Sequence, residues 1–120
     1  MEKTSAPADL RAIIVSIDLL RSNQGDLDQF NSSEFIELAR SSGLKVEYHV
    51  FSKQNFVSAS HFLTKGKADE LKDIVESENI KLVVLDCELS PSQERNLEKL
   101  LCARVLDRTG LILDIFAARA

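Results

Sequence analysis

The feature that most restricts the fold of this chain is its alternation of short apolar runs with segments of helical periodicity. Two segments, Arg11–Leu19 and Ile80–Leu85, carry short runs of β-branched and aliphatic residues that are typical of strands covered on both faces. Lys45–Phe51 alternates apolar and polar residues, and Arg104–Leu106 is short and flanked by charge. These two segments are therefore predicted to form the edges of the sheet.

Three amphipathic helices are predicted between the strands, at Ser33–Ser42, Lys67–Ser77 and Pro91–Leu101. Strands that alternate with helices indicate an α/β fold whose sheet is parallel and whose crossovers are right-handed. With the two most apolar strands at the centre, the predicted fold is a four-stranded parallel sheet of order 2-1-3-4 with helices on both faces.

Composition limits the number of domains and the class of partner. The chain has 120 residues, 44% of them hydrophobic, which fits one compact domain over residues 11–120 after a loose arm at residues 1–10. No stretch resembles a membrane span or a secretory signal, so we expect a cytoplasmic location and no membrane partner. The net charge of −4 argues against a domain that coats nucleic acid, so any RNA contact must be local.

The third predicted helix has a clear start and separates the two cysteines. Ser90 and Gln93 can form a capping box, with Pro91 at the first helical position. Cys87 and Cys102 flank this helix, which places them about 16 Å apart at ~1.5 Å per residue. Because a disulfide requires Cα atoms within about 7 Å, an intramolecular bridge is excluded, and both thiols are predicted to be buried.

Two aspartates mark the sheet edge where such folds usually hold ligands. Asp18 and Asp86 end the first and third strands, on either side of the topological switch point, and could form a crevice for a ligand. The alternative is that both are solvated strand ends.

The segment Lys53–Lys65 is long for a connection between a strand and a helix, which makes it a candidate for contact with RNA or another partner. Its aromatic and basic residues could stack on bases and meet phosphates. The candidates are Lys53, Phe56, Phe62, Lys65 and Lys67. The alternative is that the phenylalanines pack in the core and the lysines are solvated.

No catalytic residue, metal site or cofactor site is predicted in this chain. The nearest approach to a P-loop has His61 where the first glycine is required and Ala68 where a hydroxyl would hold magnesium. The histidines and cysteines show neither a metal-ligand spacing nor an oriented nucleophile. We therefore do not expect this chain alone to hydrolyse a nucleoside triphosphate by a P-loop mechanism.

The segment Leu111–Ala120 is apolar on almost every side and suggests a surface for contact. Thr109 is a plausible N-cap for a helix here, while a strand over Leu111–Phe116 is the alternative. The apolar residues could join two domains or two copies of the chain. The candidates for this surface are Leu111, Ile112, Ile115 and Phe116.

Two motifs in the last third resemble a known family. Leu89–Leu97 reads Leu-Ser-Pro-x-Gln-x-Arg-Asn-Leu, and Asp107–Phe116 reads Asp-Arg-Thr-x-Leu-Ile-Leu-Asp-Ile-Phe. Together they resemble the N-terminal region of HflX-type GTPases. Lys65–Leu71 is similar to that family's Gly-x-Gly-Lys-x-x-Glu-Leu turn, with Thr64 in place of the first glycine.

The resemblance implies a parent protein that is longer than this chain. Residues 11–120 would be its first domain, truncated before a helical hairpin and a GTPase domain that uses GTP and Mg²⁺. The parent would bind the large ribosomal subunit and help to split or rescue ribosomes under stress, while this domain would position and regulate it. The alternatives are a small domain that binds a nucleotide or magnesium, and a homodimeric interaction module.

The family motifs also contain Arg95 and Arg108. Either arginine could pair with a neighbouring carboxylate, from Asp86, Asp107 or Glu88, and so fix the join between this domain and the segment that follows. Direct contact of these arginines with RNA is the alternative.

Overall fold

The sheet of this domain is parallel and four-stranded, as the sequence predicts. The computed structural model describes residues 11–19, 34–54 and 57–119, and the side chains within α4 as far as residue 114. The strand order is β2-β1-β3-β4, and every pair of neighbours is parallel. The strands are β1 (Arg11–Leu19), β2 (Lys45–Gln54), β3 (Leu82–Asp86) and β4 (Arg104–Leu106).

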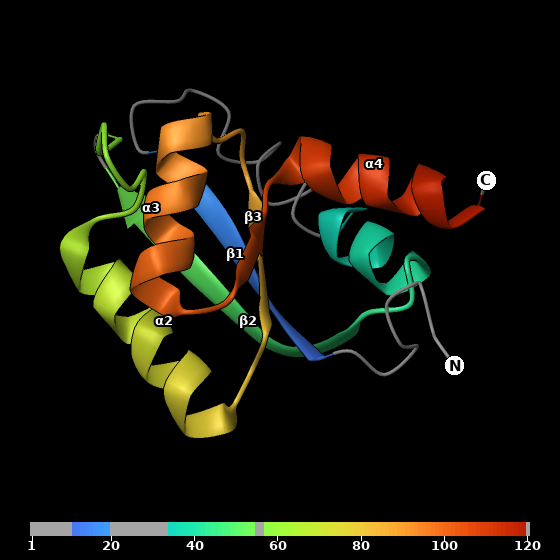
Figure 1. Cartoon of the computed structure of the whole chain (residues 1–120), viewed down its shortest axis with the longest axis horizontal. Helices are drawn as coiled ribbons and strands as arrows, with labels where there is room; N and C mark the ends of the chain where they lie inside the picture. Colours follow the sequence, from blue (N-terminus) through green and yellow to red (C-terminus); the bar gives the residue numbers. More distant parts are fainter. Residues whose placement is uncertain (1–10, 20–33, 55–56, 120) are drawn as a thin grey trace.

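Helices cover both faces of the sheet (Figure 1). One face is covered by α2 and α3, and the other by α4 and the helix at residues 34–41. The labelled helices are α2 (Lys65–Glu78), α3 (Pro91–Leu101) and α4 (Arg108–Arg119). Among the described residues, no helix is long and apolar enough to cross a membrane.

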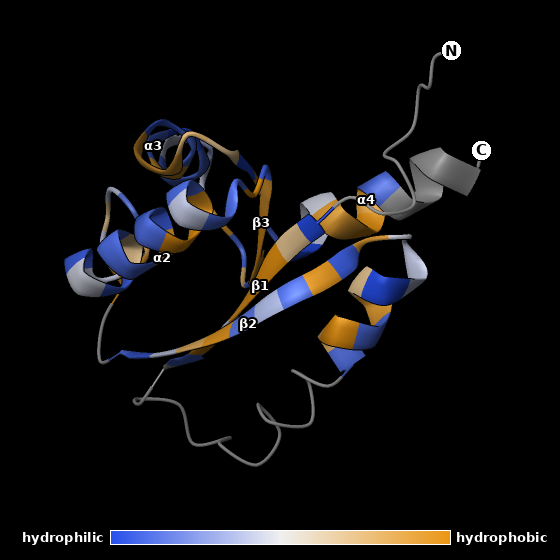
Figure 2. Ribbon diagram, turned by 90° about the horizontal axis from the view of Figure 1, so that it is seen from below, coloured by the Kyte–Doolittle hydropathy of each residue, from blue (hydrophilic) through white to orange (hydrophobic). Residues whose placement is uncertain are grey.

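Alternate residues of the central strands supply two separate cores. Ile13 and Val15 face α2 and α3, while Ala12 and Ile14 face the other pair of helices, and all four are fully buried. A strand buried on both faces needs apolar residues at every position, which explains the uninterrupted apolar runs of β1 and β3. Figure 2 shows this contrast, because the edge strand β2 mixes hydrophobic and hydrophilic residues.

Several boundaries differ from the sequence prediction, and two of them concern candidate contact residues. β2 continues to Gln54 because its backbone stays paired with β1 as far as Leu19. Lys53 therefore belongs to a strand rather than to a loop. α2 begins at Lys65 because the Thr64 side chain accepts a hydrogen bond from the backbone N–H of Lys67 and caps the helix.

The start of α3 is confirmed in detail. The Ser90 Oγ accepts from the Gln93 backbone N–H at 3.1 Å, and the Gln93 Oε1 accepts from the Ser90 N–H at 2.9 Å. The helix ends at Cys102, which has a left-handed backbone with φ of 54°. Both cysteines are free thiols, but the prediction that both are buried is wrong, because Cys102 is exposed at this helix end and Cys87 is half-buried.

Candidate functional site

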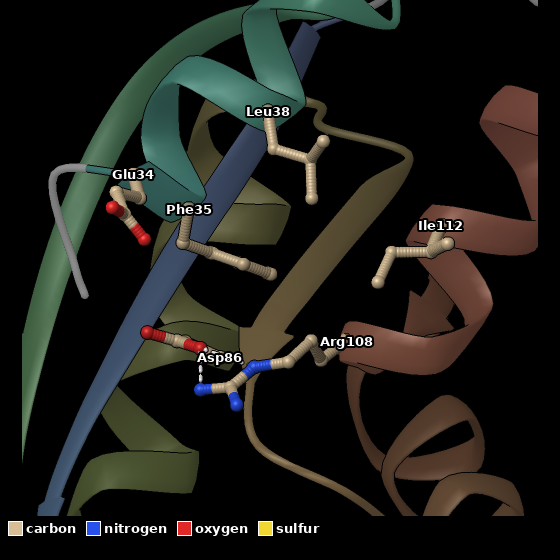
Figure 3. Close-up of a pocket in the computed structure, with 6 residues that line it drawn as sticks. All are labelled: Glu34, Phe35, Leu38, Asp86, Arg108 and Ile112. Carbon is tan, nitrogen blue, oxygen red and sulfur yellow. Dashed lines mark hydrogen bonds and ion pairs between the residues drawn. The ribbon is translucent and has the colours of Figure 1, made fainter.

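The carboxyl edge of the sheet brings a buried carboxylate to the first turn of α4. Asp86 ends β3 and is 8% exposed, and its Oδ1 accepts hydrogen bonds from both Nε and Nη2 of Arg108. The Nε–Oδ1 distance is 2.9 Å. The sequence left Asp86, Asp107 and Glu88 open as partners of an arginine. In the structure, the partner of Arg108 is Asp86 (Figure 3).

Asp107 fixes the same helix at two further points. Its Oδ1 accepts from the Gly110 backbone N–H at 2.7 Å, and its Oδ2 accepts from the Leu89 N–H at 3.1 Å. The prediction that Thr109 caps the helix is therefore wrong, because the chain turns into α4 two residues earlier and Asp107 takes the capping role. One side chain thus ties α4 to the loop between β3 and α3.

Asp18 and Asp86 are offset from each other along the carboxyl edge of the sheet. In the strand register, Asp86 lies opposite Ser16, so Asp18 extends two residues further along β1 and lies opposite Lys53 of β2. The carboxylate of Asp86 is engaged by Arg108 instead. The part of the chain that the structure describes has no group of three or more His, Cys, Asp or Glu side chains that could hold a metal ion.

A cavity of about 330 Å³ lies above this ion pair, between α4 and the helix at residues 34–41. Figure 3 shows Asp86 and Arg108 at its base, with apolar side chains from both helices above them. The lining residues are Glu34, Phe35, Leu38, Asp86, Arg108 and Ile112. This arrangement suits an apolar group near a charge rather than a hydrated cation.

A polar pair that the sequence analysis did not single out lies on the same face of the sheet. The Ser16 Oγ and the His49 Nε2 are 2.7 Å apart, and the His49 ring centroid lies 4.3 Å from that of Phe51. Burial lowers the pKa of His49, and the Asp86 carboxylate opposes this effect. Strand alternation puts both side chains on one face. The register pairs Ser16 with Phe51 and Ile14 with His49, so Ser16 and His49 meet as diagonal neighbours.

The residues proposed for contact with RNA differ in their surroundings. Phe62 is buried, as the packing alternative holds, and Phe56 lies outside the described residues. Lys65 pairs with Asp69 at 3.2 Å. On the same helix, Lys67 pairs with Glu70 at 3.0 Å.

The remaining candidates are spread over separate elements. Lys53 is exposed on β2 and Arg95 is exposed on α3. Arg108 lies across the sheet from α2 and α3, at the start of α4. A contact with RNA at these residues stays a prediction.

The apolar surface of α4 differs from the prediction among the residues whose side chains are described. Leu111 is fully buried against the sheet, so its assignment to an interdomain or dimer surface is wrong. Ile112 is 37% exposed, and the neighbouring Leu113, which was not a candidate, is 61% exposed. The side chains of Ile115 and Phe116 lie outside the described residues.

The two thiols should differ sharply in reactivity. Burial, with Asp107 and Asp86 nearby, raises the pKa of Cys87 from 9.0 to about 12. Because this folded-state pKa is the higher one, the contribution of Cys87 to stability is present below pH 9.0 and is lost as the pH rises toward about 12. We expect iodoacetamide at pH 8 to label Cys102 in the native protein and Cys87 only in denaturant, as read by peptide mass spectrometry. Equal native labelling would contradict this assignment.

Comparison with known proteins identifies the family. Residues 29–117 match the family model described as GTP-binding GTPase N-terminal. The chain belongs to this family. The matched residues of the GTP-binding GTPase N-terminal domain include the Asp86–Arg108 pair and the Asp107 cap.

Relatives of this N-terminal domain are HflX-type GTPases, as its motifs indicate. The chain is 42% identical over 95 residues to the GTPase HflX of Escherichia coli strain K12, covering 79% of the chain and 22% of the relative. It is 41% identical over 110 residues to the GTPase HflX of Caldanaerobacter subterraneus subsp. tengcongensis, covering 92% of the chain and 24% of the relative. The chain thus spans about a quarter of the length of these relatives.

A solved structure shares the fold of this domain. The crystal structure of the SsGBP and GDP complex superposes with a TM-score of 0.70 at 21% identity, covering 92% of this chain and 29% of that one. At this identity the likeness concerns the fold alone.

Proposed function

We propose that this domain positions and regulates an HflX-type GTPase that binds the large ribosomal subunit and helps to split or rescue ribosomes in the cytoplasm. The observation that carries the proposal is the attachment of α4 to the sheet through the Asp86–Arg108 pair. Membership of the GTP-binding GTPase N-terminal family supports it, as does the greater length of the relatives.

The attachment gives α4 a single direction relative to the sheet. Besides the ion pair, the Arg108 backbone N–H donates to the Cys87 carbonyl at 2.9 Å, and Asp107 holds the loop before α3. The side chain of Leu111, in the first turn of the helix, is fully buried. A helix held by backbone, charge and apolar contacts can transmit the orientation of this domain to a neighbouring domain.

GTP and Mg²⁺ belong, in this proposal, to the remainder of the parent protein. The sequence of this chain lacks the full P-loop pattern, and the buried Asp86 carboxylate at the sheet edge is neutralised by Arg108. The exposed Ile112 and Leu113 on α4 then offer a small apolar contact for the segment that follows or for the GTPase domain.

A domain exchange tests the proposal. The matched segment of the E. coli GTPase HflX is replaced by this chain, and binding to purified large ribosomal subunits is measured by cosedimentation together with GTP turnover. We expect the chimera to bind subunits and to show subunit-stimulated turnover. In the Arg108→Met chimera, we expect turnover without ribosomes to be kept and stimulation to be reduced.

The control is the E. coli protein with the same segment deleted. If the deleted protein and the chimera bind subunits equally and respond equally, the domain neither positions nor regulates the GTPase, and the proposal is wrong.

A further inference from the structure

The turn that precedes α2 is held in place by three side-chain amides from other elements. Each amide N–H donates to a backbone carbonyl of the turn at 2.8 to 2.9 Å. The pairs are Gln54 with the Phe62 carbonyl, Gln93 with the Ser58 carbonyl and Asn96 with the Ser60 carbonyl. Three carbonyls within five residues are thus fixed by β2 and α3, so the turn has one defined shape.

The same turn contains an unfavourable backbone conformation. Phe62 has a φ of 66°, in the left-handed region that a bulky side chain rarely adopts, and it is only 8% exposed. Two backbone hydrogen bonds between Ser58 and Phe62, at 3.1 and 2.9 Å, close the turn. Strain of this kind persists only where the surroundings impose it, and it is often found at binding sites.

The turn forms one wall of a cavity of about 460 Å³, whose other walls are α2 and α3. The floor is apolar and consists of Leu63, Ala68 and Leu100. The rim is polar and consists of Ser58, Ser60, His61, Thr64, Lys65 and Asp69. The cavity lies on the α2 and α3 face of the sheet, so it is separate from the cavity above Asp86 and Arg108.

The charges and hydrogen bonds of the rim indicate the kind of ligand. The Lys65 ammonium and the Asp69 carboxylate form an ion pair. Because their charges cancel, the rim favours a neutral ligand. The Ser58 Oγ already accepts from the Ser60 and His61 backbone N–H groups. His61 uses its Nδ1 with the Ser60 Oγ at 2.8 Å, so among the described residues its Nε2 is left available for a ligand.

We propose that this cavity binds a small neutral molecule that combines an aromatic ring with one hydrogen-bonding heteroatom. The ring lies over Leu63, Ala68 and Leu100, and the heteroatom meets the Nε2 of His61. The volume falls in the range of about 300–1,000 Å³ that is usual for sites of such ligands. The site is independent of the proposed coupling to a GTPase, because neither Arg108 nor α4 contributes to it.

Two neutral aromatic probes test the site on the chain itself. N-phenylnaphthylamine, a dye that brightens in apolar surroundings, is titrated with the wild-type chain, the Leu100→Trp variant and the Ile112→Trp variant. We expect one saturable site in the wild type, a loss of affinity of about tenfold or more when tryptophan fills the cavity, and no change when tryptophan is placed in the other cavity.

Indole provides a measurement that needs no variant. In the wild-type chain, we expect indole to shift the NMR signals of the His61 ring and of the backbone amides at residues 58–64, and to leave those at residues 108–112 unchanged. Absence of saturable dye binding to the wild type, equal loss in both tryptophan variants, or indole shifts confined to residues 108–112 would each overturn the proposal.

Discussion

Replacing Arg108 by methionine should lower the free energy of unfolding of this chain by about 2–4 kcal/mol. The Asp86 side chain is 6% exposed, so removal of its partner leaves a buried carboxylate without a counter-charge. Arg108 itself is 46% exposed, and water therefore reduces the cost below that of breaking a fully buried pair. The measurement is urea unfolding followed by circular dichroism.

A second ion pair of α4 supplies the matched control. Arg104 reaches Asp114 at 3.6 Å, with side chains 58% and 42% exposed, so Arg104→Met should cost no more than about 1 kcal/mol. The double variant Asp86→Leu with Arg108→Met should be more stable than Arg108→Met alone, because no unpaired charge remains. Equal losses for the two arginine variants would show that the Asp86–Arg108 pair does not fix α4.

The sheet could be predicted from sequence because its order depends on burial. The inner runs Ala12–Val15 of β1 and Leu82–Leu85 of β3 contain no polar residue, and this places both strands at the centre. The capping box at Ser90 and Gln93 was equally clear, because both partners lie within one turn of the chain. The capping box is a local signal, and the burial of a strand is a signal averaged over all its residues, so both can be read from the sequence.

The details of the sites could not be predicted, because they depend on contacts between distant segments. Several residues were plausible partners of an arginine, and only the meeting of β3 with α4 selects Asp86 for Arg108. The sequence predicts only the capping role of Gln93, yet its Nε2 also donates to the Ser58 carbonyl across 35 positions of sequence. Spacing along the chain gives no sign of such a contact.

Two residues predicted to lie on contact surfaces, Leu111 and Phe62, are buried for a related reason. An apolar side chain in a turn or in the first turns of a helix can face the core or solvent, and only packing decides. Leu111 turns into the core beneath the sheet, whereas Leu113 is directed to solvent. Phe62 is likewise buried, because the turn from Ser58 to Phe62 folds back on itself. The pattern of apolar residues alone does not separate these two outcomes.

Leu111 is the first residue of α4 whose side chain is buried, so its loss should weaken the attachment of this helix. Leu111 is fully buried in the core between α4, the helix at residues 34–41 and the sheet, so Leu111→Ala should cost about 2–4 kcal/mol. Leu113→Ala, two positions along the same helix, should change the free energy of unfolding by no more than about 0.5 kcal/mol, because that side chain is 61% exposed. Both substitutions introduce the same residue, so helix propensity is matched.

Hydrogen exchange shows whether the loss is confined to α4. In the Leu111→Ala variant, the backbone amides of α4 should exchange faster by a larger factor than those of α3, which packs on the opposite face of the sheet. If α3 and α4 were accelerated equally, Leu111 would support the whole domain rather than the attachment of this helix. A selective effect would instead show that α4 can loosen without the rest of the domain. Leu111 and the Asp86–Arg108 pair would then hold this helix to the sheet, as the proposed coupling to a GTPase requires.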